Sequence, residues 1–255
     1  ATVFGYLVIA STTQTLGSMR YVPIQIAATV IGVLLFAIVS SIDADFLSEH
    51  RMALVIFNTL LLLMIIPFGT DNGTGNKSWL DIPLVPVMIQ PAEICKITYI
   101  IVMGSVMNAH QNRISSIPSV MHMAFHLALL VGLNMVLSKD AGVSLIFVFI
   151  FIGMAFAGGV SMIWFLIGGG FLAAAAPVIW TKVMSEYQRS RILVLFDPSI
   201  DPLGLDERYH SMRSLRSLTG GGLLGQGLFN GNRTQIGALP SQHTDYIFSA
   251  IGEEM

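Results

Sequence analysis

Long apolar stretches set the strongest limit on how this chain can fold. A membrane-spanning helix needs about 20 mainly apolar residues. The stretches that approach this length are residues 22–42, 52–67, 88–107, 118–137, 141–158 and 160–181. Shorter apolar segments lie at residues 1–13 and from Tyr246 onward. Since helices satisfy their own backbone in lipid and no alternating barrel pattern is present, we expect an all-α, polytopic transmembrane protein with about seven or eight spans.

The composition supports a membrane protein and excludes a broad nucleic-acid-binding surface. Charged residues make up 11% of the chain, against roughly 25% in average globular proteins, and the mean hydropathy is +0.73. The formal net charge is −2, so no basic field suggests a nucleic acid partner. Cys95, the only cysteine, is interpreted as a buried small hydrophobe. We expect residues 1–255 to form a single membrane domain, and a fragment, because the apolar segments at both ends are short.

Two connections between the predicted spans are longer than the others. Residues 68–87 are rich in Gly, Asn and Pro, and residues 182–245 contain seven of the 13 basic residues. Four predicted spans separate these loops, so both loops are expected on the same side of the membrane. Basic residues in the short loops occur on both sides, so charge alone leaves the orientation open.

A polar triplet opens the predicted span at 88–107. Gln90, Glu93 and Lys96 are spaced by three residues and therefore share one helix face. A lysine near the centre of a span costs about 2.5–3.5 kcal/mol, which a Glu–Lys pair partly offsets. The triplet is either a structural ion pair between helices or a polar wall of a substrate cavity, and the two interpretations are compatible.

Three further patterns have a structural interpretation beside a functional one. Asp140, in the turn at 138–142, is expected as a helix N-cap that contributes about 1 kcal/mol. His122 and His126 are spaced as i, i+4, but no third ligand is near in sequence, which favours helix packing over a metal site. The glycine-rich segment Gly220–Gly231 fits neither phosphate-loop motif, so it is expected to allow close backbone approach.

Several segments together resemble one protein family in order and spacing. They are NKSWLDI at 76–82, QPAEICK at 90–96, SKDAGVSLIFVFIF at 138–151, YQRSRILVLFDP at 187–198 and GGGLLGQGLFNGNRTQIGALPSQHTDYIFSAIGEE at 220–254. This pattern resembles the SEDS family (shape, elongation, division and sporulation; FtsW, RodA and SpoVE) over nearly the whole chain. Ser241 stands where the family usually has Glu, Ala92 where Ser is common, and SKDAG replaces the usual Pro-Asp-Leu-Gly or Asn-Asp-Leu-Gly.

The resemblance implies a cell-wall enzyme with about ten spans, more than this chain contains. Members of the family polymerise peptidoglycan glycan strands from lipid II, for cell shape, division or sporulation. They work with a class B penicillin-binding protein, a transpeptidase. The resemblance also implies a place in the bacterial cytoplasmic (inner) membrane, with the long loops and the active site facing outward.

The resemblance and the chemistry together assign the catalytic role to Asp245. The leaving group of lipid II is a diphosphate, so a single base can suffice, with positive charge at the leaving oxygens. We predict that Asp245 accepts the proton of the acceptor hydroxyl as that oxygen attacks the donor anomeric carbon, with inversion. An ordinary N-cap of the next helix is the alternative role. Candidates to steady the diphosphate are a divalent cation (Mg or Mn) or Lys77, Lys96, Arg189, Arg191 or Arg233.

Other polar residues complete the expected substrate site. Trp79 is expected to line the cavity or position its loop, whereas a lone interfacial Trp is more commonly a membrane anchor. His243 and Thr244 flank Asp245 and are expected to orient it, and Glu253 and Glu254 are expected to be structural or cavity-lining. The full predicted substrate-binding set is Trp79, Lys77, Gln90, Glu93, Lys96, Asp140, Arg233, His243 and Thr244.

Two other functions remain open from the sequence. One is a lipid II flippase, which polar helices around a cavity would fit, although a flippase does not require an acidic residue at its outer rim. The other is a non-catalytic membrane scaffold for a transpeptidase.

Overall fold

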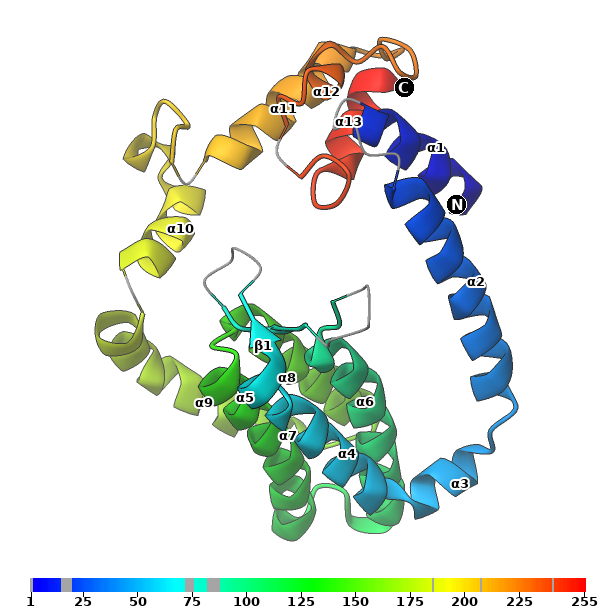
Figure 1. The fold of residues 1–255 in the computed structure, drawn as a ribbon. Helices are drawn as coiled ribbons and strands as arrows, with labels where there is room; N and C mark the ends of the chain where they lie inside the picture. The colour runs from blue at the N-terminus through cyan, green and yellow to red at the C-terminus, as the bar shows by residue number, and fades with distance from the viewer. Residues whose placement is uncertain are drawn as a thin grey trace. The chain divides into compact units, whose positions relative to one another are not determined.

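The computed structural model describes residues 2–14, 20–71, 76–81, 88–184, 186–206, 208–239 and 241–255. The chain divides into two compact units (Figure 1). The first unit contains Ala1–Ser40 and Ala175–Met255, and the second contains Ser41–Ala174. Parts of both predicted loops, residues 72–75, 82–87, 185, 207 and 240, lie outside the described residues.

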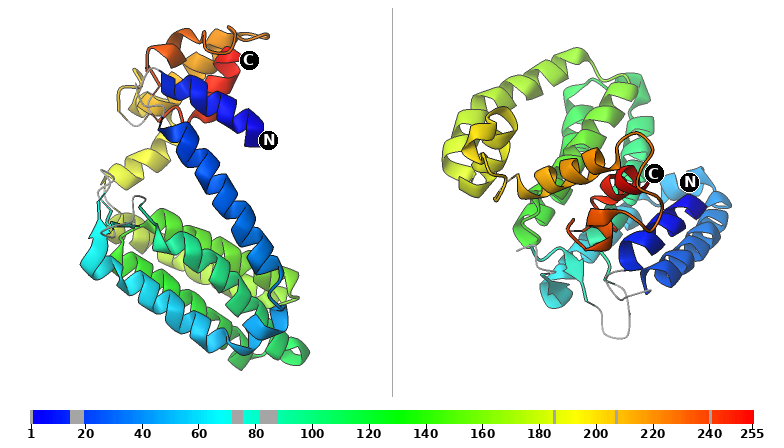
Figure 2. Two further views of the ribbon diagram at one scale, coloured as in Figure 1. Left: turned by 45° about the vertical axis from the view of Figure 1, so that its right-hand side comes forward. Right: turned by 90° about the horizontal axis from the view of Figure 1, so that it is seen from above.

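The second unit is a helical bundle with a small hairpin. Its helices are α3 (Ala44–Glu49), α4 (Arg51–Leu63), α5 (Ile65–Phe68), α6 (Pro91–Ala109), η1 (Gln111–Arg113), α7 (Ile117–Leu137), α8 (Ala141–Ala157) and the first part of α9 (Met162–Val178). In this bundle α4 packs against α6 and α7, and α7 packs against α8 (Figures 1 and 2). Proline in the first turn of α6 and of α7 favours helix initiation there. The backbone N–H that proline lacks would have no intrahelical acceptor at a helix start in any case.

Helix α6 supplies the centre of the bundle core. Its buried residues Cys95, Tyr99, Val102 and Val106 follow spacings of four, three and four, so they lie on one face. Tyr99 meets Phe147 of α8 edge to face, with ring centroids 5.7 Å apart. The prediction that Cys95 is buried is confirmed, since its side chain is 0% exposed.

A two-stranded antiparallel sheet lies between α5 and α6. It joins β1 (Gly69–Thr70) to β2 (Trp79–Leu80), with Thr70 opposite Trp79. Leu80 also bridges to Ile89, just before α6, through backbone hydrogen bonds of 2.8 and 3.3 Å. These pairings attach the segment that carries Trp79 to the start of α6. These two short strands were not predicted from the sequence.

The first unit is built from helices of both ends of the chain. They are α1 (Thr2–Gln14), α2 (Tyr21–Ser40), the end of α9, η2 (Ile179–Val183), α10 (Glu186–Phe196), η3 (Pro198–Ile200), α11 (Tyr209–Gly221), α12 (Asn232–Gln235) and α13 (Ile247–Glu254). Helix α13 packs against α11 and against α1 (Figures 1 and 2). The segment 182–245, predicted as one long loop, therefore contains three α-helices, α10, α11 and α12, among its described residues.

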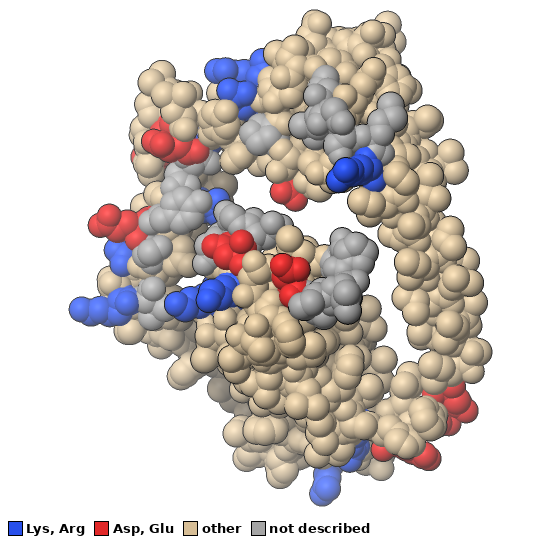
Figure 3. Space-filling model, in the orientation of Figure 1, with Lys and Arg blue, Asp and Glu red and all other residues tan. Residues whose placement is uncertain are grey.

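The described chain has five helical stretches long and apolar enough to cross a membrane. They are Tyr21–Ser40, Arg51–Phe68, Pro91–Ala109, Ile117–Leu137 and Met162–Lys182. Helix α8, predicted as a sixth span, is a shorter apolar helix. Helix α2 has no buried residue, and the face drawn in Figure 3 is uncharged along it, as expected for a surface in contact with lipid. The chain is thus a polytopic membrane protein, and the larger count of seven or eight spans stays a prediction.

Candidate functional site

Asp245 lies in a tight turn that leads into α13. Ser241 adopts a left-handed conformation with φ 48°. Its carbonyl oxygen accepts hydrogen bonds from the backbone N–H groups of Thr244 and Tyr246, at 3.1 and 3.3 Å. The N-cap position of α13 belongs to Tyr246, and no side chain caps the helix. Asp245 itself is exposed, and its carboxylate forms no hydrogen bond or ion pair with the described residues. Asp245 therefore does not cap α13 in this structure.

Glu253 holds the glycine-rich segment against α13. Its side chain is 0% exposed. The carboxylate accepts hydrogen bonds from the N–H of Arg233 at 2.6 Å, the N–H of Thr234 at 3.1 Å and the hydroxyl of Thr234 at 2.9 Å. These N–H groups belong to the first turn of α12, where helix amides lack intrahelical partners. A buried carboxylate thus caps a short helix from 19 residues away.

Glu254 makes a second set of contacts beside it. Its carboxylate accepts from the hydroxyl of Ser11 at 2.6 and 2.8 Å, the amide of Gln235 at 2.8 Å and the N–H of Phe229 at 3.2 Å. Neither Glu253 nor Glu254 forms an ion pair with a described basic side chain. A buried carboxylate is costly unless it is hydrogen-bonded. The hydrogen bonds that satisfy these two carboxylates also hold α1, α12 and α13 together. This agrees with the structural role expected for them.

The glycines of this segment allow the backbone to approach closely. A Cβ on Gly225 would lie 2.4 Å from the backbone N of Met255, and one on Gly221 would lie 1.9 Å from the carbonyl oxygen of Gly252. Gly225 also has φ 68°, which an L side chain rarely adopts. The predicted close backbone approach at Gly220–Gly231 is confirmed.

The other predicted residues of the first unit, Arg233, His243 and Thr244, form no hydrogen bond with the Asp245 side chain. The hydroxyl of Thr244 donates to the carbonyl oxygen of Ser241 at 3.3 Å. The ring of His243 packs against Tyr21, with centroids 4.6 Å apart. Arg233 is half-buried and its backbone N–H binds Glu253. In the described structure neither His243 nor Thr244 orients the Asp245 carboxylate through a hydrogen bond, so their expected role stays a prediction.

A basic pocket borders the same turn. Arg191 was among the candidates predicted from the sequence to steady the diphosphate, but this pocket was not predicted. It has a volume of about 470 Å³ and is lined by residues of α10, η3, the start of α11 and Tyr246. The basic lining residues are Arg191, Arg208 and His210. The rings of His210 and Tyr246 are stacked, with centroids 5.9 Å apart and planes 12° apart. Because Tyr246 follows Asp245 directly, this pocket is a neighbour of the candidate base.

Asp201 fixes the loop that brings Arg208 to the pocket. The N–H of Arg208 donates to its carboxylate at 3.0 Å, as do those of Leu205 at 3.0 Å and Asp206 at 3.1 Å. The hydrogen bond from the Arg208 amide lowers the pKa of the Asp201 carboxyl below its ordinary value. Burial raises this pKa in opposition, and the amides of Leu205 and Asp206 lower it further. The ionised carboxylate therefore acts as the organising acceptor of the loop.

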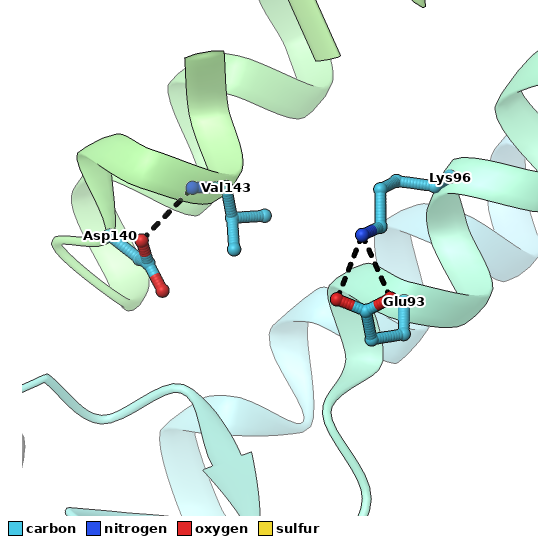
Figure 4. Close-up of polar contacts among 4 residues, drawn as sticks. All are labelled: Glu93, Lys96, Asp140 and Val143. Atoms are coloured by element: carbon cyan, nitrogen blue, oxygen red, sulfur yellow. Dashed lines mark hydrogen bonds and ion pairs between the residues drawn. The ribbon is translucent and has the colours of Figure 1, made fainter. Parts of the chain in front are cut away.

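In the second unit, Asp140 caps helix α8. Its carboxylate accepts from the N–H of Val143 at 3.0 Å (Figure 4) and from the hydroxyl of Ser78, beside β2, at 3.3 Å. The predicted N-cap is confirmed. The contact with Ser78 additionally ties the Trp79 segment to the turn between α7 and α8.

The pair of Glu93 and Lys96 forms at the start of α6. Lys96 Nζ lies 2.8 Å from each carboxylate oxygen of Glu93 (Figure 4). The Glu93 side chain is 55% exposed and that of Lys96 is 17% exposed. Both residues belong to one helix, so the pair does not join two helices. Gln90 holds the N-cap position of α6 without a side-chain cap.

The remaining predicted residues, Lys77 and Trp79, lie at the hairpin. Trp79 is half-buried in β2, and Lys77 is exposed just before it. The structure thus places Lys77, Trp79, Gln90, Glu93, Lys96 and Asp140 in the second unit, and Arg233, His243, Thr244 and Asp245 in the first. Their assignment to one substrate site stays a prediction.

Among the described residues, no group of three or more His, Cys, Asp or Glu side chains is arranged to hold a metal ion. His122 and His126 contact each other through their Nε2 atoms at 3.2 Å, on one face of α7. A divalent cation at the diphosphate stays a prediction.

Comparison with known proteins places these features in a family. The sequence profile described as "FTSW_RODA_SPOVE: Cell cycle protein" matches residues 2–255. The peptidoglycan glycosyltransferase MrdB of Escherichia coli is 31% identical over 258 residues, which cover 99% of this chain and 66% of MrdB. The probable peptidoglycan glycosyltransferase FtsW of Trichlorobacter lovleyi is 32% identical over 232 residues, covering 87% of this chain and 59% of that protein. The peptidoglycan glycosyltransferase RodA of Mycobacterium tuberculosis is 31% identical over 253 residues, covering 91% and 50%.

A solved structure shows the same fold. It was reported under the words "structural coordination of polymerization and crosslinking by a peptidoglycan synthase complex". The TM-score is 0.67 at 25% sequence identity, over 99% of this chain and 70% of that chain. The present chain spans 50–66% of the length of the three curated relatives named above. On the match over residues 2–255, this chain belongs to the FtsW/RodA/SpoVE (SEDS) family of bacterial membrane cell cycle proteins.

Proposed function

We propose that this protein is a glycosyltransferase that polymerises peptidoglycan strands from lipid II, a disaccharide linked through diphosphate to a polyprenyl chain. The names of its relatives support the reaction class, since those proteins are called peptidoglycan glycosyltransferases. The several apolar helices support a site at a membrane, where a lipid-linked donor resides. We assign the protein to the bacterial cytoplasmic membrane, with its active site facing outward.

The exposed, unbonded carboxylate of Asp245 is the observation that carries the proposal. Surface carboxylates at helix starts commonly cap the helix, whereas this one neither caps α13 nor pairs with a described cation. The turn around it is nevertheless fixed. Gln242, beside that turn, donates to the carbonyl oxygens of Thr12 at 2.6 Å and Thr234 at 3.1 Å. A free carboxylate on a fixed backbone has the properties needed in a general base.

The proposed reaction uses Asp245 as that base. The carboxylate accepts the proton of an acceptor sugar hydroxyl while the hydroxyl oxygen forms a bond to the anomeric carbon of the donor. The bond from that carbon to the diphosphate oxygen breaks, and the diphosphate leaves with the bonding electrons. A single displacement inverts the anomeric configuration. General-base assistance typically contributes about 10²–10⁴-fold to the rate.

The residues of the second unit are proposed to contact substrate as well. Lys96 and Glu93 form a polar pair at the start of α6. Trp79, half-buried in its hairpin, presents an aromatic surface suited to packing against a sugar or a lipid. These roles rest on the family resemblance and on the polar character of the α6 start.

We also propose a class B penicillin-binding protein as the partner. Support comes from the structural neighbour, which belongs to a peptidoglycan synthase complex that combines polymerization with crosslinking. A strand that is polymerised beside a transpeptidase can be crosslinked as it emerges.

The test measures strand synthesis and lipid translocation with the same preparation. The purified protein is supplied with lipid II in detergent, and the glycan products are separated by length. In parallel, the protein is reconstituted in vesicles with fluorescent lipid II in one leaflet. The proposal expects polymer in the first assay and no protein-dependent translocation in the second. Translocation without polymer would support a flippase, and neither activity, with partner binding intact, would support a scaffold.

A further inference from the structure

We propose that the pocket between α10 and the start of α11 binds the diphosphate of the lipid-linked donor, beside Asp245. This inference rests on the proposed function, because it names where the leaving group of that reaction would be held. The evidence is the charge of the pocket, the positions of Arg208 and His210, the apolar side chains in its lining and its connection to the turn of Asp245.

The lining of the pocket has the charge that an anion requires. Arg191, Arg208 and His210 line it together with the hydroxyl-bearing Ser211 and Tyr246, and the described lining contains no acidic residue. Two carboxylates in the segment that follows α10, those of Asp197 and Asp201, already accept hydrogen bonds. Asp197 accepts from Ser199 at 2.6 and 3.0 Å, and Asp201 accepts the backbone N–H groups of its own loop. Arginine binds phosphate oxygens with paired, charge-assisted hydrogen bonds.

Two of the three basic residues, Arg208 and His210, are held in place before any ligand arrives. The guanidinium of Arg208 donates to the carbonyl oxygens of Pro198 and Asp201, both at 3.3 Å. The imidazole of His210 is stacked on the ring of Tyr246. Because little side-chain freedom is lost on binding, such a pocket favours a ligand more than mobile surface cations do.

Apolar side chains line this pocket as well. Val194 and Leu195 contribute to the lining, and Leu195 is 76% exposed. The next residue along the chain, Phe196, is 83% exposed. A soluble anion does not use such a surface, whereas the polyprenyl chain of a lipid-linked diphosphate does. The combination of basic and exposed apolar side chains therefore favours an amphiphilic ligand over free diphosphate.

Tyr246 connects the pocket to the proposed base. It lines the pocket and follows Asp245, and consecutive Cα atoms lie about 3.8 Å apart. In the displacement, the base removes a proton from the incoming hydroxyl while the departing diphosphate gains negative charge. A pocket one residue away from the base can stabilise that charge with its arginines.

The experiment measures binding separately from polymerisation. The purified protein in detergent is titrated with farnesyl diphosphate, inorganic diphosphate and farnesol. Arg191→Gln and His210→Gln are each expected to weaken farnesyl diphosphate binding by about 10-fold, the equivalent of one charge-assisted hydrogen bond. Arg191→Lys is expected to retain most of the binding because it keeps the charge. Asp245→Asn is expected to bind normally while losing strand synthesis.

Arg216→Gln is the matched control, because Arg216 is an exposed residue of α11 that does not line the pocket. It removes the same charge and is expected to bind as the unmodified protein does. Unchanged binding in Arg191→Gln and His210→Gln would overturn the proposal, as would equal binding of farnesol. If inorganic diphosphate bound as tightly as farnesyl diphosphate, the assignment to a lipid-linked ligand would be overturned. If the unmodified protein makes no strands but the pocket variants still lose farnesyl diphosphate binding, the result would support the pocket and contradict the proposed function.

Discussion

The hydroxyl of Ser11 donates to the carboxylate of Glu254 across 243 residues of sequence, at 2.6 and 2.8 Å. This contact joins α1 to α13, the helix that directly follows the turn of Asp245. The same carboxylate accepts hydrogen bonds from the side-chain amide of Gln235 and the backbone N–H of Phe229. The candidate base is thus carried by a segment whose position depends on buried hydrogen bonds to distant parts of the chain.

Glu254→Gln is expected to destabilise the first unit. An amide has a single acceptor oxygen and would turn its NH₂ toward groups that donate in the native structure. The loss corresponds to at least one hydrogen bond to a charged group, about 1.5–3 kcal/mol. Thermal unfolding in detergent measures it, with exposed Glu186→Gln as the control. Equal midpoints for the two variants would contradict the role given to Glu254.

Adjacent glycines at the end of α11 should respond oppositely to alanine. In Gly221→Ala the new Cβ would lie 1.9 Å from the carbonyl oxygen of Gly252 and 2.8 Å from Cα of Glu253, so α11 and α13 must separate. We expect a loss of about 1–3 kcal/mol. In Gly220→Ala the nearest atom is 3.5 Å away, at the end of the Gln226 side chain. Alanine there should be neutral or stabilise by up to about 1 kcal/mol. Unfolding midpoints of both variants decide, and equal effects would contradict the proposed packing.

The loop organised by Asp201 should lose stability in acid. The pKa of Asp201 is lower in the folded protein than its ordinary value of 3.8. Its ionised form therefore stabilises the folded state above the ordinary value, and this contribution is lost as the pH falls through the folded pKa. Asp201→Asn should lower the unfolding midpoint at pH 6, and the difference from the unmodified protein should shrink below about pH 4. A difference that is independent of pH would contradict this role.

Glu93→Gln separates a stabilising role from a substrate-binding role. The pair with Lys96 is exposed on the Glu93 side, so its loss should cost only about 0.2–1 kcal/mol. If Glu93 and Lys96 contact the donor, strand synthesis should nevertheless fall by about 10-fold. Unfolding and polymerisation are measured on the same preparation. Full activity at slightly reduced stability would leave the pair a structural one.

The membrane helices were predictable because length and hydropathy are strong local signals. The span predicted at 22–42 corresponds to Tyr21–Ser40, and the one at 118–137 to Ile117–Leu137. Helix α11 was missed because it lies in a segment too polar to be read as a membrane span, although Met212, Leu215 and Leu218 recur at a helical spacing. Its buried residues are the small Ser217 and Gly221. Its packing depends on close approach to α13, which a local pattern does not contain.

The candidate site was predictable where chemistry follows from neighbouring residues. The cap by Asp140 and the pair of Glu93 with Lys96 arise from short spacings, and both form. The pocket beside Tyr246 was not predictable, because Arg191 and His210 line one pocket only once α10, η3 and the start of α11 have folded around it. The buried bonds of Glu254 likewise join residues far apart in sequence.

The central claim is that Asp245 is the catalytic base, and one comparison tests it most directly. Asp245→Asn and the control Asp206→Asn, at another exposed position of the first unit, are purified and assayed with lipid II under identical conditions. Because Asp245 makes no hydrogen bond with the described residues, both variants should unfold like the unmodified protein. The account predicts that Asp245→Asn lowers the rate of strand synthesis by about 100-fold or more, while Asp206→Asn retains it. Strand synthesis by Asp245→Asn at the rate of the control would contradict the account.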